Sequence, residues 1–325
     1  MLSETKPIGL SGVKPTGRPH IGNYFGAMRQ FVALQEEYRM FVFIADLHGL
    51  NLIQDASMMR ELSLGVAIDY LALGLDPSKA VLYRQSDIPE ITELSWILGT
   101  LTTMPYLMRA HAFKDAEAKN KDINVGTFTY PVLMAADILI QDAQVVPVGK
   151  DQEQHLEIAR DMAAKFNTTF GETFIAPKSV IMEDVATVPG IDGRKMSKSY
   201  DNTIPLFGSD DEIVKAVAGI VTDSRLPEEP KNPDADNIFA LHKLFSTSVL
   251  PDIERRYCQG GMGYKESKDI LREHILDFVR PLREKREAIL EDVSTVERIL
   301  DEGGKVARER AIIKLNDVRK KTGLR

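Results

Sequence analysis

Short segments that are apolar at every position, separated by stretches with helical spacing, constrain the fold of this chain more than any other feature. Residues 40–45 (MFVFIA) are the clearest example, and such a run is typical of a strand buried on both faces. Further strands are predicted at 7–11, 80–84 and 145–148, and helices at 21–38, 57–73 and 152–166. In the second helix Ser57 is the expected N-cap and Gly74 the expected C-cap. The alternation predicts an α/β fold with a doubly wound, Rossmann-like parallel sheet, in which ligands bind beyond the carboxyl ends of the strands.

The pattern changes after residue 204, where strand signals end. We therefore expect a Rossmann-like domain at 1–204, with a mostly helical insertion at about 91–141, and an all-helical domain at 205–290. Within the second domain, Pro281 is expected to break or kink a long helix. C-terminal helices at 291–325 are predicted to pack back toward the first domain.

The end of the chain is basic. Residues 303–325 contain eight Lys or Arg residues against Glu309 and Asp317, although the whole chain carries a net charge of −7. Two interpretations remain open for this segment: the solvated face of a terminal helix, or a surface that contacts phosphates.

The composition of the 325 residues is that of an ordinary globular protein, with 43% hydrophobic and 27% charged residues, and it excludes a disordered chain or a coiled coil. No apolar run approaches the roughly 18 residues that span a bilayer, and the first residues lack a signal-peptide core. The single cysteine, Cys258, fits a reducing compartment. We expect a cytoplasmic protein without a membrane or DNA partner. Its acidity argues against a protein that coats nucleic acid, but a single folded RNA bound by a local basic patch remains possible.

The first motif with chemical content follows the first predicted strand and reads KPTGRPHIGN, from Lys14 to Asn23. A glycine-bearing turn before a helix lets the backbone approach an anion. His20 can donate an imidazole N–H to a phosphate oxygen, Thr16 can offer a hydroxyl, and Gly22 leaves room for a flat nucleoside. The alternative is a tight strand-to-helix turn with an exposed histidine.

The second motif, GRKMSKS at 193–199, places Lys195 and Lys198 three positions apart after a loop rich in glycine and proline. Lysine suits a loop that closes over a polyphosphate, because its ammonium group is a compact charge on a flexible stem. Taken alone, the motif is also compatible with an ordinary lysine-rich loop.

Together, HIGN near the start of a parallel α/β domain and KMSKS at its end resemble the paired motifs of class I aminoacyl-tRNA synthetases. The resemblance to bacterial-type tryptophanyl-tRNA synthetases extends over essentially the whole chain, through ADLH, TYPVLMAADIL and VPVGKDQ. It implies catalytic roles for His20, Lys195 and Lys198. It also implies that the ATP-binding residues are Lys14, Pro15, Thr16, Gly22, Asn23, Gly149, Lys150, Asp151, Lys195, Met196, Ser197, Lys198 and Ser199.

Asp137 lies among apolar residues in a helix predicted to start near Pro131. A carboxylate buried there needs a hydrogen-bond donor, which is supplied either by an ion pair or helix cap, or by a ligand N–H. Indole has one polar group, and that group only donates. The resemblance implies that Asp137 binds the tryptophan side chain, with Met134 on the same helix face, and that the tryptophan-binding residues are Asp137, Gln152, His48, Tyr130 and Met134. His48 could instead be a core histidine, and Asp151 a helix cap.

The resemblance further implies two reactions: activation of tryptophan by ATP to tryptophanyl-adenylate, and transfer to tRNA(Trp). ATP is the expected substrate, with Mg²⁺ carried by ATP, since no carboxylate cluster resembles a metal site. The helical domain is expected to read the anticodon, and a homodimer is expected. The alternatives are a tyrosyl-tRNA synthetase, a tRNA-independent nucleotidylyltransferase and a non-catalytic RNA-binding paralogue.

Four positions depart from the commoner family pattern. Lys14 and Leu47 stand where glutamines are usual, and Leu10 stands where phenylalanine is usual. A loop lysine often seen in the family has no match at Ala116. These changes border the expected ATP and amino-acid sites. We therefore expect differences from the commoner family members in nucleotide affinity, use of Mg²⁺ and inhibitor sensitivity.

Overall fold

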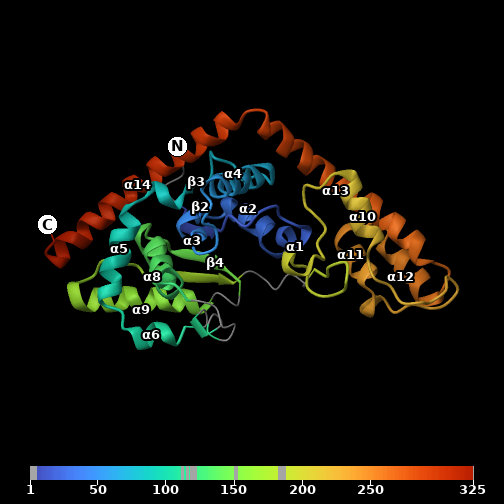
Figure 1. The fold of residues 1–325 in the computed structure, drawn as a ribbon, viewed down its shortest axis with the longest axis horizontal. Coiled ribbons are helices and arrows are strands. Elements are labelled where there is room, and N and C mark those ends of the chain that lie inside the picture. Colours follow the sequence, from blue (N-terminus) through green and yellow to red (C-terminus); the bar gives the residue numbers. More distant parts are fainter. Residues whose placement is uncertain are drawn as a thin grey trace. The chain divides into compact units, whose positions relative to one another are not determined.

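The computed structural model describes residues 6–110, 113, 114, 117, 123–149, 153–181 and 188–324. The chain forms two compact units, which can be followed by colour in Figure 1. The sheet unit comprises Met1–Gly17, Phe31–Glu183 and Asp292–Arg325, and the helical unit comprises Arg18–Gln30 and Asp184–Glu291.

The sheet unit contains a five-stranded parallel sheet with the strand order β3-β2-β1-β4-β5. Its strands are β1 (Ile8–Val13), β2 (Arg39–Ile44), β3 (Val81–Arg84), β4 (Val145–Val148) and β5 (Lys178–Ile181). The order and direction confirm the predicted doubly wound sheet. The strand β5 has no predicted counterpart, because this short strand at the sheet edge begins with the polar pair Lys178–Ser179 and lacks a continuous apolar run.

Helices cover the sheet and carry much of the core. They are α3 (Asp46–Gly49), α4 (Ala56–Ala72), α5 (Glu90–Thr100), α6 (Met104–Met108), α8 (Val125–Ile140), α9 (Glu153–Phe170) and α14 (Val293–Thr322). The second half of α8 is almost entirely buried, from Ala135 to Ile140. Such a helix, apolar on all sides, belongs to the interior of a domain. It therefore holds its one acidic residue, Asp137, away from water.

The predicted caps of α4 need one correction. Asp55, not Ser57, is the N-cap: its Oδ1 accepts a hydrogen bond from the Met58 N–H at 2.8 Å. The Ser57 hydroxyl instead donates to the same carboxylate at 2.5 Å. A charged acceptor binds the free N–H groups of a first turn more strongly than a hydroxyl does. At the other end Gly74 has a φ of +100°, as expected for a glycine that follows a helix.

The helix predicted at 21–38 is not continuous. It consists of α1 (Ile21–Asn23), a π-helical turn (Tyr24–Met28), α2 (Arg29–Ala33) and a 3₁₀ turn (Leu34–Glu36). The wider turn coincides with close ring packing in the helical unit, where Phe25 lies 5.3 Å from Phe245 and 5.7 Å from Phe278 between ring centroids. These rings hold the segment after His20 against the helical unit.

The helical unit contains α10 (Asp210–Ala218), α11 (Asn237–Phe245), α12 (Leu250–Gln259) and α13 (Tyr264–Leu290). This confirms the all-helical character predicted beyond residue 204. Pro281 does not break α13, which continues to Leu290. Because Pro281 is exposed, water can reach the backbone carbonyl that its ring leaves without an N–H partner. None of the helices in the described part of the chain combines the length and the apolar character needed to cross a membrane.

The two units divide the chain at 183/184, whereas the sequence analysis placed a domain boundary at 204/205. Backbone hydrogen bonds account for the difference, because the Ile21 N–H donates to the Ile204 carbonyl at 3.0 Å and the Leu206 N–H to the Pro19 carbonyl at 3.0 Å. These bonds join the segment before residue 205 to the HIGN segment within the helical unit. The functional roles predicted for the domains stay predictions.

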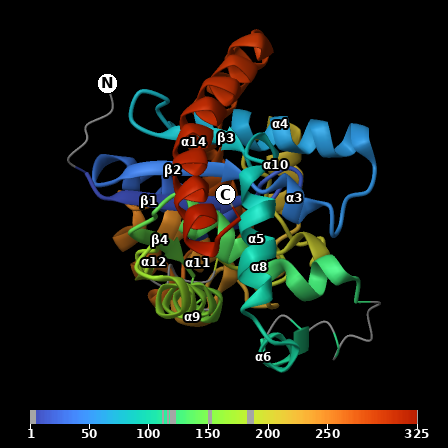
Figure 2. The ribbon, with the colours of Figure 1, turned by 90° about the vertical axis from the view of Figure 1, so that its left-hand side faces the viewer.

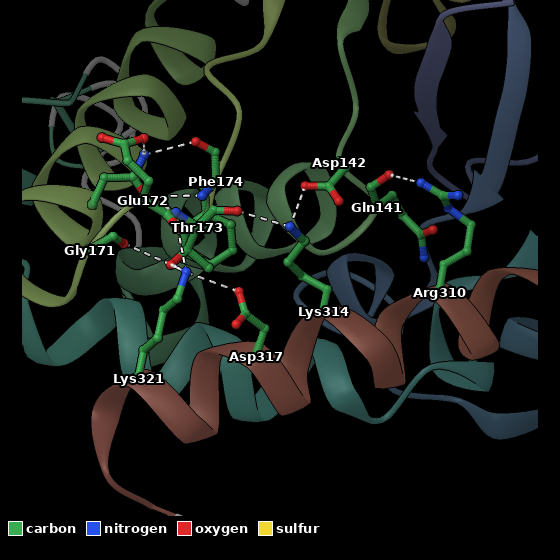
Figure 3. A network of polar contacts seen from close by, with 11 residues as sticks. Gln141, Asp142, Gly171, Glu172, Thr173, Phe174, Arg310, Lys314, Asp317 and Lys321 are labelled. Atoms are coloured by element: carbon green, nitrogen blue, oxygen red, sulfur yellow. Dashed lines mark hydrogen bonds and ion pairs between the residues drawn. The ribbon is translucent and has the colours of Figure 1, made fainter. Parts of the chain in front are cut away.

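The basic residues of the C-terminal helix are largely engaged in contacts with the sheet unit (Figure 3). Lys314 Nζ lies 2.7 Å from Asp142 Oδ1 and donates to the Thr173 carbonyl at 2.9 Å. Lys321 donates to Thr173 Oγ1 at 2.9 Å, and Arg310 to the Gln141 carbonyl at 3.0 Å. Arg308 and Arg319 pair with Glu90 and Glu93 of α5. The positive charge of this helix thus serves mainly to attach it to the sheet unit, rather than to form a solvated face or a phosphate-binding surface.

Figure 2 shows α14 lying across β3 and beside α5. Two adjacent glycines permit this close approach. A Cβ on Gly303 would overlap the Leu82 carbonyl oxygen, and one on Gly304 would lie 2.9 Å from Asp87 Oδ2. Small residues at this crossing bring the helix backbone against the edge of the sheet.

Gly303→Ala is therefore expected to destabilise the protein by about 3 kcal/mol, because the added methyl group must push α14 away from β3. Chemical denaturation followed by circular dichroism measures this loss. The matched control is Gly65→Ala in α4, where a Cβ meets no atom within 4 Å. That variant is expected to gain up to about 1 kcal/mol from helix propensity. Equal stability of the two variants would contradict the packing argument.

Candidate active site

Asp137 is 2% exposed and is held by two side chains that follow neighbouring strands. Gln85, directly after β3, donates from Nε2 to Asp137 Oδ1 at 2.8 Å and to Oδ2 at 2.9 Å. His48, in α3 after β2, places Nε2 3.0 Å from Oδ2. The buried carboxylate is therefore held by an amide and an imidazole within the described part of the chain, rather than by a lysine or arginine.

The lone pairs of Asp137 limit what else it can bind. A carboxylate has about four acceptor positions, and these contacts use one on Oδ1 and two on Oδ2. The hydrogen bonds made by the described residues therefore leave one acceptor position on Oδ1 for a further donor. Burial raises the pKa of Asp137, while the hydrogen bonds from His48 and Gln85 favour its charged form. The site suits a ligand that offers a single N–H in apolar surroundings.

Tyr130 and Met134 lie on the same face of α8 as Asp137, since residues three and four positions apart are neighbours on a helix. The Tyr130 hydroxyl lies 2.9 Å from His155 Nε2, and its ring centroid lies 6.2 Å from that of His48. Lys14 Nζ lies 5.7 Å from the Tyr130 ring centroid. Lys14, His48, Tyr130 and Asp137 are thus brought together in the sheet unit.

The carboxyl ends of β1 and β4 flank the point where the strand order reverses, and ligands of doubly wound sheets bind there. Lys14 follows β1 and Gly149 follows β4. Burial lowers the pKa of Lys14. Pro15 packs close to Gly49, where a Cβ would lie 3.0 Å from its ring. Lys150, Asp151 and Gln152 lie outside the described residues.

His20 belongs to the helical unit and is 6% exposed. Its Nδ1 accepts a hydrogen bond from the Asn23 backbone N–H at 3.2 Å, and its own backbone N–H donates to Asn23 Oδ1 at 3.0 Å. With Nδ1 as acceptor, the hydrogen of the neutral ring lies on Nε2. Asn23 therefore holds His20 in the form that can donate to a phosphate oxygen.

The KMSKS segment lies in the same unit as His20. Met196 is buried, and its Cβ lies 3.2 Å from where a Cβ on Gly22 would be. Lys195 and Lys198 are exposed. The structure thus brings the two predicted phosphate motifs together and directs the two lysine side chains outward, as binding of a polyphosphate requires.

A residue outside the motif organises this segment. The buried Asn202 accepts from the Ser197 N–H at 2.8 Å and donates to the Lys195 carbonyl at 3.2 Å. The hydroxyls of Ser197 and Ser199 lie 2.8 Å apart. These contacts fix the backbone that carries both lysines.

Sequence reasoning missed Gln85, His155 and Asn202 as parts of the site. Gln85 directly follows a predicted strand, so its position at the carboxyl end of that strand was a usable signal. His155 lies on α9, opposite Tyr130, and Asn202 acts through backbone groups. Neither contact can be found without the fold.

His20 is expected to stay neutral in solution well below pH 6.5, because burial and the nearby Lys198 lower its pKa to about 4. NMR titration of the histidine-labelled protein, with His20→Gln for assignment, measures this value. Lys198→Ala is expected to move the His20 titration upward, toward 6.5, while Lys195→Ala leaves it in place. A wild-type His20 that titrates near pH 6.5 would contradict this environment.

Comparison with known proteins agrees with this geometry. A family model described as tRNA synthetases class I (W and Y) matches residues 3–280. Proteins named tryptophan–tRNA ligase from Rhodopirellula baltica and Fusobacterium nucleatum are 52% and 48% identical over 97% of this chain, and the matches cover 99% and 97% of their own lengths. The crystal structure of tryptophanyl-tRNA synthetase from Campylobacter jejuni, complexed with ADP and tryptophan, matches with a TM-score of 0.92 at 46% identity, over 97% of this chain and 99% of that one. The chain belongs to the class I tRNA synthetases of the W and Y family.

Proposed function

We propose that this protein is a tryptophan–tRNA ligase, which activates L-tryptophan with ATP and transfers it to tRNA(Trp). The observation that carries the proposal is the buried Asp137, which has one acceptor position left on Oδ1 in apolar surroundings. Indole has one N–H and otherwise needs only an apolar pocket. Relatives named tryptophan–tRNA ligase match nearly the whole chain.

The first reaction joins two substrates without a protein nucleophile. A carboxylate oxygen of tryptophan attacks the α-phosphorus of ATP, and the bond from that phosphorus to the bridging oxygen of the β-phosphate breaks. The products are tryptophanyl-adenylate and pyrophosphate. In the second reaction a ribose hydroxyl at the tRNA 3′ end attacks the acyl carbon, and AMP leaves. The protein contributes positioning and charge stabilisation.

We assign the phosphate contacts to the helical unit. The neutral His20 donates from Nε2 to a phosphate oxygen, and Lys195 and Lys198 neutralise charge that develops on the leaving pyrophosphate. Gly22 and the hydroxyls of Ser197 and Ser199 add neutral contacts in this unit, and Thr16 is assigned to ATP binding within the sheet unit. In the sheet unit, Lys14 provides a positive charge beside Tyr130, close to the side chains assigned to the amino acid.

Mg²⁺ is proposed to arrive bound to ATP, where it would supply positive charge to the phosphates. In the described part of the chain, no group of three or more His, Cys, Asp or Glu side chains is arranged to hold a metal ion. The contribution of the protein is then the lysine and histidine contacts to the same phosphates. Gly149 to Asp151 are assigned to the adenosine part, and Gln152 to the polar end of the amino acid.

The helical unit is proposed to read the tRNA anticodon, and the active form is proposed to be a homodimer in the cytoplasm, where charging of tRNA takes place. The family resemblance is what supports the homodimer. Sedimentation tests the assembly, and a stable, fully active monomer would refute it.

Pyrophosphate exchange across a panel of amino acids, followed by charging of purified tRNA, tests the function. The expected result is exchange with tryptophan alone and charging of tRNA(Trp). Exchange with tyrosine would favour a tyrosyl-tRNA synthetase. Exchange with tryptophan but no charging of tRNA would favour a tRNA-independent nucleotidylyltransferase. The absence of any exchange would favour a non-catalytic paralogue.

A further inference from the structure

Asp46 connects the two elements that hold the buried carboxylate. Its Oδ1 accepts from the Leu47 N–H at 2.8 Å and from the Ser86 N–H at 3.0 Å, and its Oδ2 accepts from the Ser86 hydroxyl at 2.5 Å. The register of the sheet explains why Asp46 and Ser86 lie close together. Ile44 of β2 pairs with Arg84 of β3, and Asp46 and Ser86 each lie two residues beyond this pair. We call these hydrogen bonds between Asp46 and Ser86 the Asp46 bridge.

The Asp46 bridge lies close in sequence to His48 and Gln85, the two residues that contact Asp137. On one side Asp46 begins α3, which carries His48, and on the other Ser86 follows Gln85. A third bond closes the arrangement, since the His48 N–H donates to Gln85 Oε1 at 3.3 Å. This bond turns the amide so that Nε2 faces the carboxylate.

We propose that Asp46 is a positioning residue for recognition of the indole N–H: by joining α3 to the segment after β3, the Asp46 bridge sets where His48 and Gln85 donate to Asp137 and which acceptor position stays open. This inference rests on the proposed function. The hydrogen bonds of Asp46 among the described residues go to Leu47 and Ser86 and not to Asp137, so Asp46 acts on the hydrogen-bond geometry through His48 and Gln85. Its charge also raises the pKa of Asp137, an effect that Asp46→Asn removes while keeping the bridge. Loss of the bridge lets the donors shift, and the open acceptor position is then no longer fixed.

The test compares tryptophan with an analogue in which sulfur replaces the indole N–H, β-(3-benzothienyl)alanine, in pyrophosphate exchange. Asp46→Ala is expected to lower the preference for tryptophan about tenfold and to raise the KM for tryptophan about tenfold, with the KM for ATP within twofold. Ser86→Ala removes one bond of the bridge and is expected to lower the preference about threefold. Asp46→Asn keeps both contacts, because the serine hydroxyl can accept as well as donate, and should stay within threefold of the wild type.

Asp55→Ala is the matched control, because it removes an aspartate that caps α4 through similar hydrogen bonds away from Asp137. It should leave the preference unchanged. A wild-type preference for tryptophan that Asp46→Ala and Ser86→Ala both retain would overturn the inference. If Asp46→Ala does not fold, Ser86→Ala decides in the same way. A wild type without any preference would instead contradict the proposed function, which keeps the two failures distinct.

Discussion

Replacing Lys195 by alanine (K195A) is expected to slow formation of tryptophanyl-adenylate by about 100-fold or more, equivalent to about 2.7 kcal/mol of transition-state stabilisation. The reason is that the exposed ammonium group of Lys195 is assigned to charge that grows as pyrophosphate departs. Because that charge is largest in the transition state, binding of tryptophan should be nearly unchanged. Stopped-flow kinetics of activation and equilibrium binding of tryptophan measure the two quantities separately.

Lys215→Ala is the control for a simple loss of positive charge from the helical unit, because Lys215 is exposed on α10 outside both motifs. It should activate tryptophan at the wild-type rate. A loss below threefold for K195A, or equal losses for both variants, would remove Lys195 from the catalytic role.

Asp137→Ala is expected to lower kcat/KM for tryptophan by about 10³-fold, or about 4 kcal/mol, and to remove most of the preference over the benzothienyl analogue. The variant deletes the acceptor for the indole N–H and leaves the Gln85 amide and the His48 ring without their shared partner in a buried place. Pyrophosphate exchange with both amino acids measures the preference, and exchange at saturating tryptophan measures the remaining rate.

Asp142→Ala is the matched control, because Asp142 lies just after the same helix and pairs with Lys314 of α14. It should lower stability while the preference for tryptophan stays as in the wild type. An Asp137→Ala variant that still prefers tryptophan by the wild-type factor would show that the indole is recognised elsewhere.

The parts of the fold that the sequence predicts are those with a strong local signal. The strands at 40–45 and 145–148 have continuous apolar runs and lie where expected, as β2 and β4. The edge strand β5 has a polar start, so its position depends on pairing with β4. Serine is a good cap, so the sequence favours Ser57 as the N-cap of α4, but Asp55 two residues earlier is a stronger acceptor.

The same distinction applies to the site. His20, the KMSKS lysines and Asp137 have characteristic residue types and positions, so the sequence points to them. Gln85 follows a predicted strand and so gives a weaker signal, whereas Asp46 becomes informative only when β2 and β3 are known to lie side by side. The role of the basic residues of α14 could not be predicted for a related reason. The carbonyls and carboxylates that these residues contact lie far away in the sequence.

The attachment of α14 has a consequence for how the protein is made. The helix that covers β3 and α5 is encoded after the whole helical unit, so a ribosome must add roughly 200 residues beyond β3 before its cover emerges. During that interval the nascent sheet exposes an edge and an apolar face, both of which favour aggregation. We expect translation that stops before residue 293 to yield a product that chaperones retain, even though every strand has already been synthesised.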